Sequence, residues 1–248
     1  MLIEGLKSLL RPAARVVGLA KPLPAKKPWR DPAQREQIID NFHGLYYDGI
    51  RRGETWGNTF FMGIKVEKCP MDLWLHQELI FASKPDVIVE TGTRFGGSAL
   101  WFASLCDLVG KGRVVTVDID DTVSGRPVHP RITYVHGSSA DSALVDSIRD
   151  QIGAGETVMV VLDSDHGAGH VLAELRLFAE LVTPDSYLVV EDTNINGHPV
   201  IPEFGPGPME ALDQFLQEDR RFEVDKIGEK FYLTFNPRGV LRKRKATA

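Results

Sequence analysis

Short apolar runs alternate with helical patterns through most of this 248-residue chain. The runs are rich in β-branched residues, which is typical of strands buried in a sheet. They span Val87–Glu90, Val114–Asp118, Ile132–His136, Val158–Asp163 and Tyr187–Glu191. Between the last two, Gly167–Val182 repeats apolar residues at three- and four-residue steps, the spacing of one helix face. The alternation predicts βαβ units and a parallel sheet.

The chain ends on a different pattern. Phe222–Ile227 and Lys230–Phe235 are two strand-like runs separated by Gly228 and Glu229, which is a hairpin signal. We therefore expect a mostly parallel seven-stranded sheet that ends in an antiparallel hairpin, with helices on both faces. This α/β architecture is the Rossmann-like fold of class I methyltransferases.

Proline and charge divide the chain into three parts. Pro22, Pro24, Pro28 and Pro32 block regular structure and predict a linker. We expect a basic arm and linker over residues 1–32, one folded domain over 33–240 and a basic tail over 241–248. The arm is interpreted as loosely ordered, and a weak peripheral contact with an anionic membrane is the alternative.

The composition is that of an ordinary soluble domain, with 43% hydrophobic and 25% charged residues and a formal charge of −5. That charge gives no reason to expect nucleic acid as a partner. No run of about 18 apolar residues predicts a membrane span, and the broken N-terminal pattern is unlike a secretion signal. Cys69 and Cys106 fit buried thiols in a cytoplasmic protein, peripheral at the inner membrane face if the arm binds there. Whether copies of the chain associate as a homo-oligomer stays open.

The carboxyl ends of the predicted strands carry the candidate chemistry, because ligands bind there in open α/β sheets. The first strand ends at Glu90 and continues into a glycine-rich turn. An acid before such a turn suits the cationic amino group and sulfonium of S-adenosylmethionine better than a phosphate. The donor-binding candidates of this turn are Glu90, Gly92, Thr93, Arg94, Gly96 and Ser98, with Ser98 also placed to cap the helix that follows.

Two further strand ends extend the predicted donor site. Asp118 closes the second strand, where a carboxylate accepts hydrogen bonds from ribose hydroxyls. Ser139 follows the third strand, where an adenine edge would sit, or else it caps the next helix.

Acids gather at the ends of the fourth and fifth strands, which deliver Asp163, Asp165, His166, Glu191 and Asp192. Such a group of anions needs a counter-charge. Oxygen ligands favour Mg²⁺ or Mn²⁺, which the carboxylates of this group would supply, and Asp163 is also placed beside the donor. Two alternatives stay open: an iron site drawn from His166, His198 and Glu191, and helix capping by Asp163 or Asp165.

From about Gly63 to Gly207 the sequence resembles the cephalosporin hydroxylase family, and most closely its mycobacterial rhamnosyl O-methyltransferase members. The resemblance rests on the segments 63–68, 72–74, 77–78, 91–98, 162–166, 189–192, 194–199 and 204–208. It implies metal ligation by Asp163, Glu191 and Asp192, donor binding around Glu90–Ser98 and Asp118, and a sugar hydroxyl as the acceptor.

The sequence thus predicts a metal-dependent O-methyltransferase that moves a methyl group from S-adenosylmethionine to a mannose or rhamnose unit of a polysaccharide or glycolipid precursor. His166 is the preferred base, with Asp165 and His198 as the other catalytic candidates. Trp56 is a sugar platform, Trp74 a core residue, and the loop Thr193–Met209 an acceptor wall. The rival interpretations are an iron-dependent hydroxylase of a small molecule and a non-catalytic subunit that keeps the donor fold.

Overall fold

The computed structural model describes residues 27–245. The chain divides into two units, Met1–Ile39 and Asp40–Ala248. The described part of the first unit contains the 3₁₀ helix η1 (Pro28–Arg30) and the start of α2 (Pro32–Asp48). Most of the predicted basic arm lies outside the described residues, and so does the expected membrane contact. No helix among residues 27–245 is long and apolar enough to cross a membrane.

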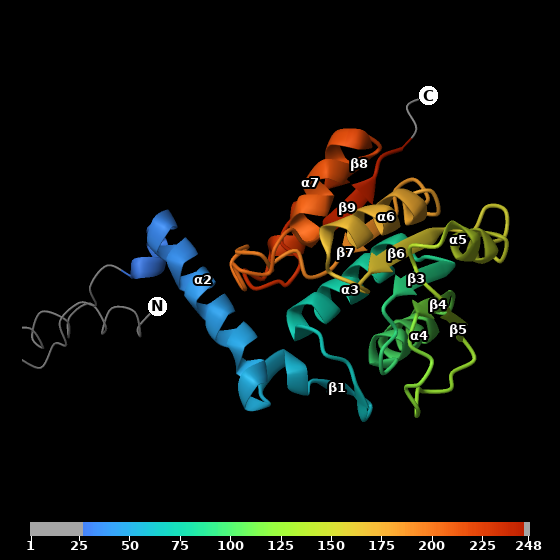
Figure 1. The fold of residues 1–248 in the computed structure, drawn as a ribbon, viewed down its shortest axis with the longest axis horizontal. Coiled ribbons are helices and arrows are strands. Elements are labelled where there is room, and N and C mark those ends of the chain that lie inside the picture. The colour runs from blue at the N-terminus through green and yellow to red at the C-terminus, as the bar shows by residue number, and fades with distance from the viewer. Residues whose placement is uncertain (1–26, 246–248) are drawn as a thin grey trace, which may run out of the picture. The chain divides into compact units, whose positions relative to one another are not determined.

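The second unit is built on a seven-stranded sheet of order β5-β4-β3-β6-β7-β9-β8 (Figure 1). The first five strands in this order are parallel, and β9 and β8 are antiparallel to their neighbours. The strands are β3 (Val87–Thr91), β4 (Arg113–Asp118), β5 (Ile132–His136), β6 (Val158–Leu162), β7 (Tyr187–Val190), β8 (Phe222–Val224) and β9 (Val240–Lys243). The predicted mixed sheet is confirmed.

Helices cover both faces of this sheet because its strands alternate their side chains. Val89 packs with one apolar cluster that includes Leu175 and Leu212, whereas Ile88 packs with another that includes Leu75 and Phe102. The first cluster joins α5 (Ser142–Arg149), α6 (Ala168–Phe178) and α7 (Pro208–Glu218), and the second joins α3 (Pro70–Ser83) and α4 (Gly97–Val109). Before α3 lie η2 (Gly49–Arg52), η3 (Thr55–Asn58) and a small hairpin of β1 (Phe60–Phe61) and β2 (Ile64–Lys65).

The predicted hairpin at the end of the chain has the wrong second strand. β8 pairs with β9, whereas Lys226–Glu229 is the 3₁₀ helix η4 and residues 230–235 form no strand. The reason is that Leu233 and Phe235 pack into a separate cluster with Cys69, so this apolar run serves a buried loop. Leu241–Lys243, expected in a basic tail, instead belong to β9.

Two further details of the sequence analysis change. The helix expected over Gly167–Val182 ends at Phe178. Trp74 was expected in the core, but its side chain on α3 is 58% exposed, because Leu75 and Leu79 take the buried positions of that helix. Cys69 and Cys106 are buried free thiols, as predicted.

Candidate functional site

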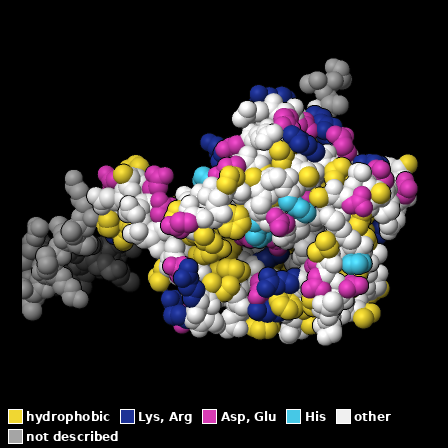
Figure 2. Space-filling view, in the orientation of Figure 1, with side chains coloured by type: hydrophobic (Ala, Val, Ile, Leu, Met, Phe, Trp, Pro, Cys, Tyr) yellow, Lys and Arg dark blue, Asp and Glu magenta, His cyan; other side chains and the backbone are white. Residues whose placement is uncertain are grey.

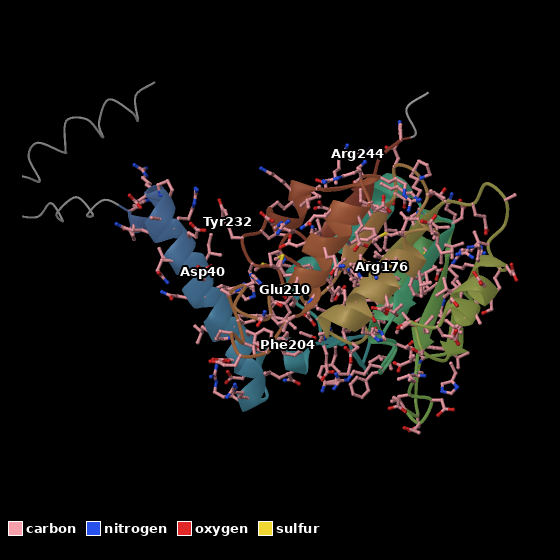
Figure 3. All side chains as sticks on the ribbon, turned by 45° about the horizontal axis from the view of Figure 1, so that its top comes forward. Asp40, Arg176, Phe204, Glu210, Tyr232 and Arg244 are labelled. Atoms are coloured by element: carbon pink, nitrogen blue, oxygen red, sulfur yellow. The ribbon has the colours of Figure 1, made fainter. Side chains whose placement is uncertain are left out.

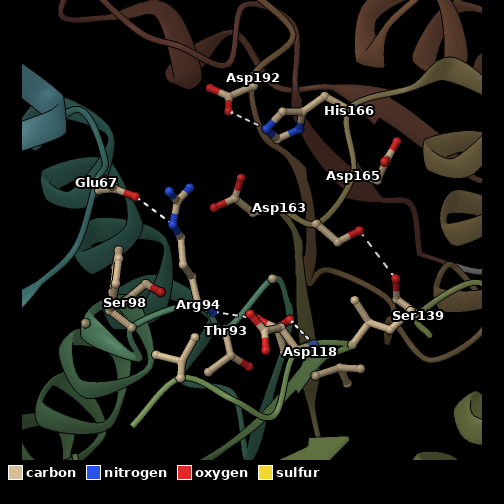
Figure 4. A pocket seen from close by; sticks show the side chains of 18 of the residues that line it. Glu67, Thr93, Arg94, Ser98, Asp118, Ser139, Asp163, Asp165, His166 and Asp192 are labelled. Carbon is tan, nitrogen blue, oxygen red and sulfur yellow. Dashed lines mark hydrogen bonds and ion pairs between the residues drawn. The ribbon is translucent and has the colours of Figure 1, made fainter. Parts of the chain in front are cut away.

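A cavity of about 640 Å³ opens at the carboxyl edge of the parallel strands. Figure 2 shows a hollow on this unit with acidic and histidine side chains at its border, and Figure 4 shows part of the residues that line the cavity. Among the predicted site residues, the lining contains Gly92, Thr93, Arg94, Ser98, Asp118, Ser139, Asp163, Asp165, His166 and Asp192. Glu90, Gly96, Glu191 and His198 are not part of the lining. The structure therefore brings most of the predicted strand-end residues into one space.

The glycine-rich turn after β3 lies directly against the turn after β6. Gly92 has a φ of 83°, and a Cβ atom at this position would lie 1.8 Å from the carbonyl oxygen of Asp163. Only glycine fits such an approach. The two turns are thereby held together, so the expected donor loop and Asp163 share one wall of the cavity.

Glu90 lies behind this wall and is fully buried. Its carboxylate accepts a hydrogen bond from Thr116 Oγ1 at 2.7 Å and another from Ser98. Burial raises the pKa of Glu90 to about 7. The expected capping role of Ser98 is wrong, because the N-cap of α4 is Gly96 and no side chain caps that helix end.

Asp118 is held in place by the backbone. Its Oδ2 accepts a hydrogen bond from the amide of Arg94 at 2.6 Å, and its Oδ1 accepts one from the amide of Asp120 at 2.9 Å. The guanidinium of Arg94 turns away to Glu67, where Nε lies 2.9 Å from the Glu67 carboxylate (Figure 4). Glu67 lines the cavity and was not among the predicted residues.

Ser139 does not cap a helix, since Asp141 is the N-cap of α5. Its hydroxyl lies 3.3 Å from Ser164 Oγ and 3.1 Å from His170 Nε2. Both neighbours line the cavity with it. Ser139 thus belongs to a polar patch of the cavity wall.

Asp163, His166 and Asp192 converge on one side of the cavity. Each offers a ligand atom, and these atoms lie within 4.8 Å of one another. His166 Nε2 is 3.1 Å from Asp192 Oδ2 (Figure 4). Burial lowers the pKa of His166, but the hydrogen bond and charge of Asp192 outweigh it and raise the pKa to about 9. Asp165 Oδ1 accepts a hydrogen bond from the amide of Gly167 at 2.7 Å, but Gly167 itself is the N-cap of α6 and no side chain caps that helix end, so neither Asp163 nor Asp165 takes the alternative capping role.

Glu191, the third predicted metal ligand, is engaged by a residue that the sequence analysis did not assign. Lys68 is buried, and its ammonium lies 2.5 Å from Asp163 Oδ2 and also contacts Glu191 Oε2. Burial alone would lower the pKa of Lys68, but the charges of Asp163 and Glu191 raise it above its ordinary value. The other oxygen of Glu191 is buried without a hydrogen-bond partner, 3.5 Å from His76 Nε2.

His198 lies apart from these residues. Its Nε2 is 2.9 Å from Glu210 Oε1, and the second oxygen of Glu210 accepts the amide of Gly207 at the start of α7. Figure 3 labels Glu210 and Phe204 on this part of the chain. His198 therefore helps to fix the loop before α7, and the structure does not bring it to the cavity.

Aromatic rings form another part of the cavity wall. Tyr47 and Trp56 line it, and the Trp56 indole donates a hydrogen bond to the backbone oxygen of Tyr47 at 3.0 Å. Phe235 packs edge-on against Trp56 with ring centroids 5.6 Å apart. The run Lys230–Phe235, which was predicted to be a strand, thus supports the two lining rings through Phe235.

A donor loop on β3, an acid at the end of β4 and a seven-stranded sheet with an antiparallel end together define the fold of S-adenosylmethionine-dependent methyltransferases. The chain belongs to the Rhamnosyl O-methyltransferase/CmcI family, which matches residues 54–244. This confirms the predicted family, and with it the enzyme class, an S-adenosylmethionine-dependent O-methyltransferase.

Individual relatives agree with this assignment. The rhamnosyl O-methyltransferase of Mycobacterium bovis (strain BCG / Pasteur 1173P2) is 37% identical over 217 residues, which cover 83% of this chain and 85% of the relative. Two solved structures of CmcI share the fold at 20% identity. The apo form has a TM-score of 0.59 over 77% of this chain and 78% of its own, and the complex with Mg and SAM has a TM-score of 0.57 over 76% and 78%.

Proposed function

We propose that this protein is a metal-dependent O-methyltransferase that transfers a methyl group from S-adenosylmethionine to a hydroxyl of a sugar, namely a rhamnose or mannose unit of a polysaccharide or glycolipid precursor. One observation carries the proposal. Asp163 lies in the same cavity as Gly92 and Asp118 and also belongs to the trio with His166 and Asp192. The donor loop and the acidic cluster therefore meet at one residue.

The donor side of the cavity rests on Asp118 and the turn after β3. Both oxygens of Asp118 are oriented by backbone amides, which leaves the carboxylate fixed where it can accept further hydrogen bonds from a diol. Ser139 and His170 line the same cavity beyond this point and supply polar atoms for a base edge. Thr93 and Arg94 would contact the donor along the same turn.

The acidic side fits a divalent cation. Asp163 and Asp192 offer carboxylate oxygens within 4.8 Å of each other, and oxygen ligands are those that Mg²⁺ or Mn²⁺ prefers. Asp163 and Asp192 would hold the ion, and the unpartnered buried oxygen of Glu191 keeps that residue a candidate third ligand. When bound, such an ion lowers the pKa of a sugar hydroxyl and neutralises the developing alkoxide. The CmcI complex with Mg and SAM supports the same pair of cofactors.

The aromatic wall is the proposed acceptor subsite. Tyr47 and Trp56 present rings to the cavity, and the apolar faces of sugars pack on such rings. The rhamnosyl O-methyltransferase relatives support a sugar as the acceptor. We infer that Trp56, and not the exposed Trp74, is the platform.

His166 is the proposed base, because it lines the cavity beside Asp192, whereas His198 contacts Glu210 outside the lining. Asp192 raises the pKa of His166, so a divalent ion held by Asp192 would offset that charge and favour the neutral imidazole that accepts a proton. Replacing His166 by Ala should leave donor binding within about twofold and lower kcat by at least a hundredfold, the usual size of a general-base effect. His198→Ala is the matched control and should retain most of its kcat. Full activity in His166→Ala with lost activity in His198→Ala would reverse the assignment.

Calorimetry with S-adenosylmethionine, with and without Mg²⁺, tests the function. We expect the donor to bind in the calorimeter. We expect methyl transfer to a sugar only when the metal is present. Turnover that needs iron and 2-oxoglutarate, without any donor binding, would support the hydroxylase instead. Binding of the donor without turnover on any sugar would support the non-catalytic subunit.

A further inference from the structure

Lys68 is a buried cation inside the acidic cluster. Its side chain is 4% exposed, and its ammonium contacts one oxygen each of Asp163 and Glu191. The segment that carries it is anchored on both sides: the Lys68 amide lies 3.3 Å from Thr59 Oγ1, and α3 begins at Pro70. The ammonium therefore has a fixed place between the two acids.

The same acids are those expected to bind the metal. Asp163 contacts Lys68 through Oδ2 and is also a member of the trio with His166 and Asp192. A divalent ion and the ammonium would share the Asp163 carboxylate. Two cations that share one carboxylate repel each other, and the repulsion is strong where water is excluded.

We propose that Lys68 is a built-in counter-cation that neutralises the acidic cluster without metal and weakens the binding of the divalent ion, so that the ion loads reversibly. This inference rests on the proposed function, because it concerns the metal of the methyl-transfer site. A buried carboxylate pair without a counter-charge is strongly destabilising. Lys68 removes that penalty, so the folded protein does not require the metal.

The proposal fixes the direction in which metal affinity responds to the loss of Lys68. Methionine has a similar length and no charge, so Lys68→Met removes the ammonium and leaves Asp163 and Glu191 free for the ion. At an effective dielectric constant of about 20, a single and a double charge about 5 Å apart repel by far more than the energy of a tenfold change in affinity. We therefore expect at least tenfold tighter binding of Mn²⁺ in this variant.

The control removes the same charge far from the cluster. Lys111 pairs with Asp86 at 2.7 Å, and Asp86 comes just before β3, at the opposite edge of the sheet. Lys111→Met should bind Mn²⁺ as the wild type does. Lys68→Arg keeps the charge and should not bind Mn²⁺ more tightly than the wild type.

The experiment is a titration of each full-length protein with Mn²⁺, followed by electron paramagnetic resonance of the free ion. Tighter binding in Lys68→Met alone supports the proposal. Equal or weaker binding in Lys68→Met overturns it, since Lys68 would then only orient the ligands. A calorimetric titration of the wild type with S-adenosylmethionine is run beside it. Absence of donor binding there defeats the proposed function, whatever the Mn²⁺ affinities are.

The wild type provides a second test should Lys68→Met fail to fold. Because Lys68 compensates the acids, wild-type protein treated with a chelator should melt within about 2 °C of untreated protein, which corresponds to at most about 1 kcal/mol for a domain of this size. A chelator-induced loss of the folded state would overturn the proposal, since the metal itself would then be the counter-charge.

Discussion

Replacing Gly92 by alanine should break the contact that joins the donor loop to Asp163. The new Cβ would lie 1.8 Å from the Asp163 carbonyl oxygen and 2.6 Å from its carbonyl carbon. Both atoms belong to the backbone, so the clash is relieved only if the turns after β3 and β6 move apart. The matched control is Gly155→Ala, at a φ of 85° against 83° for Gly92, with no atom within 4 Å of the new Cβ.

The difference between the two variants isolates the clash. The left-handed backbone costs an alanine about 1 to 2 kcal/mol at either position. Gly92→Ala adds the cost of overpacking, about 1 to 3 kcal/mol. We expect Gly155→Ala to lower the free energy of unfolding by about 1 kcal/mol and Gly92→Ala by about 3 kcal/mol.

Urea unfolding and Mn²⁺ binding measure the two consequences. Gly92→Ala should also weaken Mn²⁺ binding at least tenfold, because the displaced carbonyl belongs to a candidate ligand residue. Gly155→Ala should bind Mn²⁺ as the wild type does. If Gly92→Ala is as stable as Gly155→Ala and binds Mn²⁺ as the wild type does, the turns after β3 and β6 do not lie as close together as described.

Two further predictions concern acid stability and donor affinity. Burial lowers the pKa of His43 to about 4, so the unfolded chain binds this proton from pH 6.5 downward while the folded protein does not, and stability falls as the pH falls from 6.5 toward 4. Between pH 7 and pH 5 the His43→Gln variant should therefore lose about 2 kcal/mol less stability than the wild type, as measured by urea unfolding. His136→Gln is the control and should lose as much as the wild type. An unchanged loss in His43→Gln would contradict the burial of a neutral imidazole. Asp118→Asn should weaken S-adenosylhomocysteine binding at least tenfold in calorimetry, about 1.4 kcal/mol, and the exposed Asp121→Asn should leave it unchanged; equal affinity in both variants would exclude Asp118 as the ribose ligand.

The strand ends were predictable because topology brings them together. Buried β-branched runs mark parallel strands, and the carboxyl ends of parallel strands meet at one edge. Asp118, Asp163 and Asp192 were found in this way. Glu90 lies near the end of β3 too, but its side chain shares a face with Ile88 and lies beneath α4. The alternation of side chains along a strand could have predicted this burial, because Glu90 lies two residues after the apolar Ile88.

Lys68 could not be found by the same reasoning. It lies in the segment before α3 and not at a strand end, so its place among the acids depends on tertiary packing. The acids in the sequence correctly indicated that a positive charge lies near them, but the sequence analysis assigned that charge to a metal alone. The prediction of a strand over Lys230–Phe235 was wrong for a related reason, since an apolar run fits a buried loop as well as a strand.

The central claim is that one cavity holds donor, metal and sugar for methyl transfer. The direct measurement is incubation of the full-length protein with methyl-labelled S-adenosylmethionine, Mg²⁺ and a panel of rhamnosides and mannosides, followed by analysis of the labelled products. The account predicts a labelled O-methyl sugar whose formation stops when the metal is chelated and resumes when Mg²⁺ is restored. Label transfer that persists after complete chelation, or no transfer to any sugar by protein that binds the donor, would contradict it.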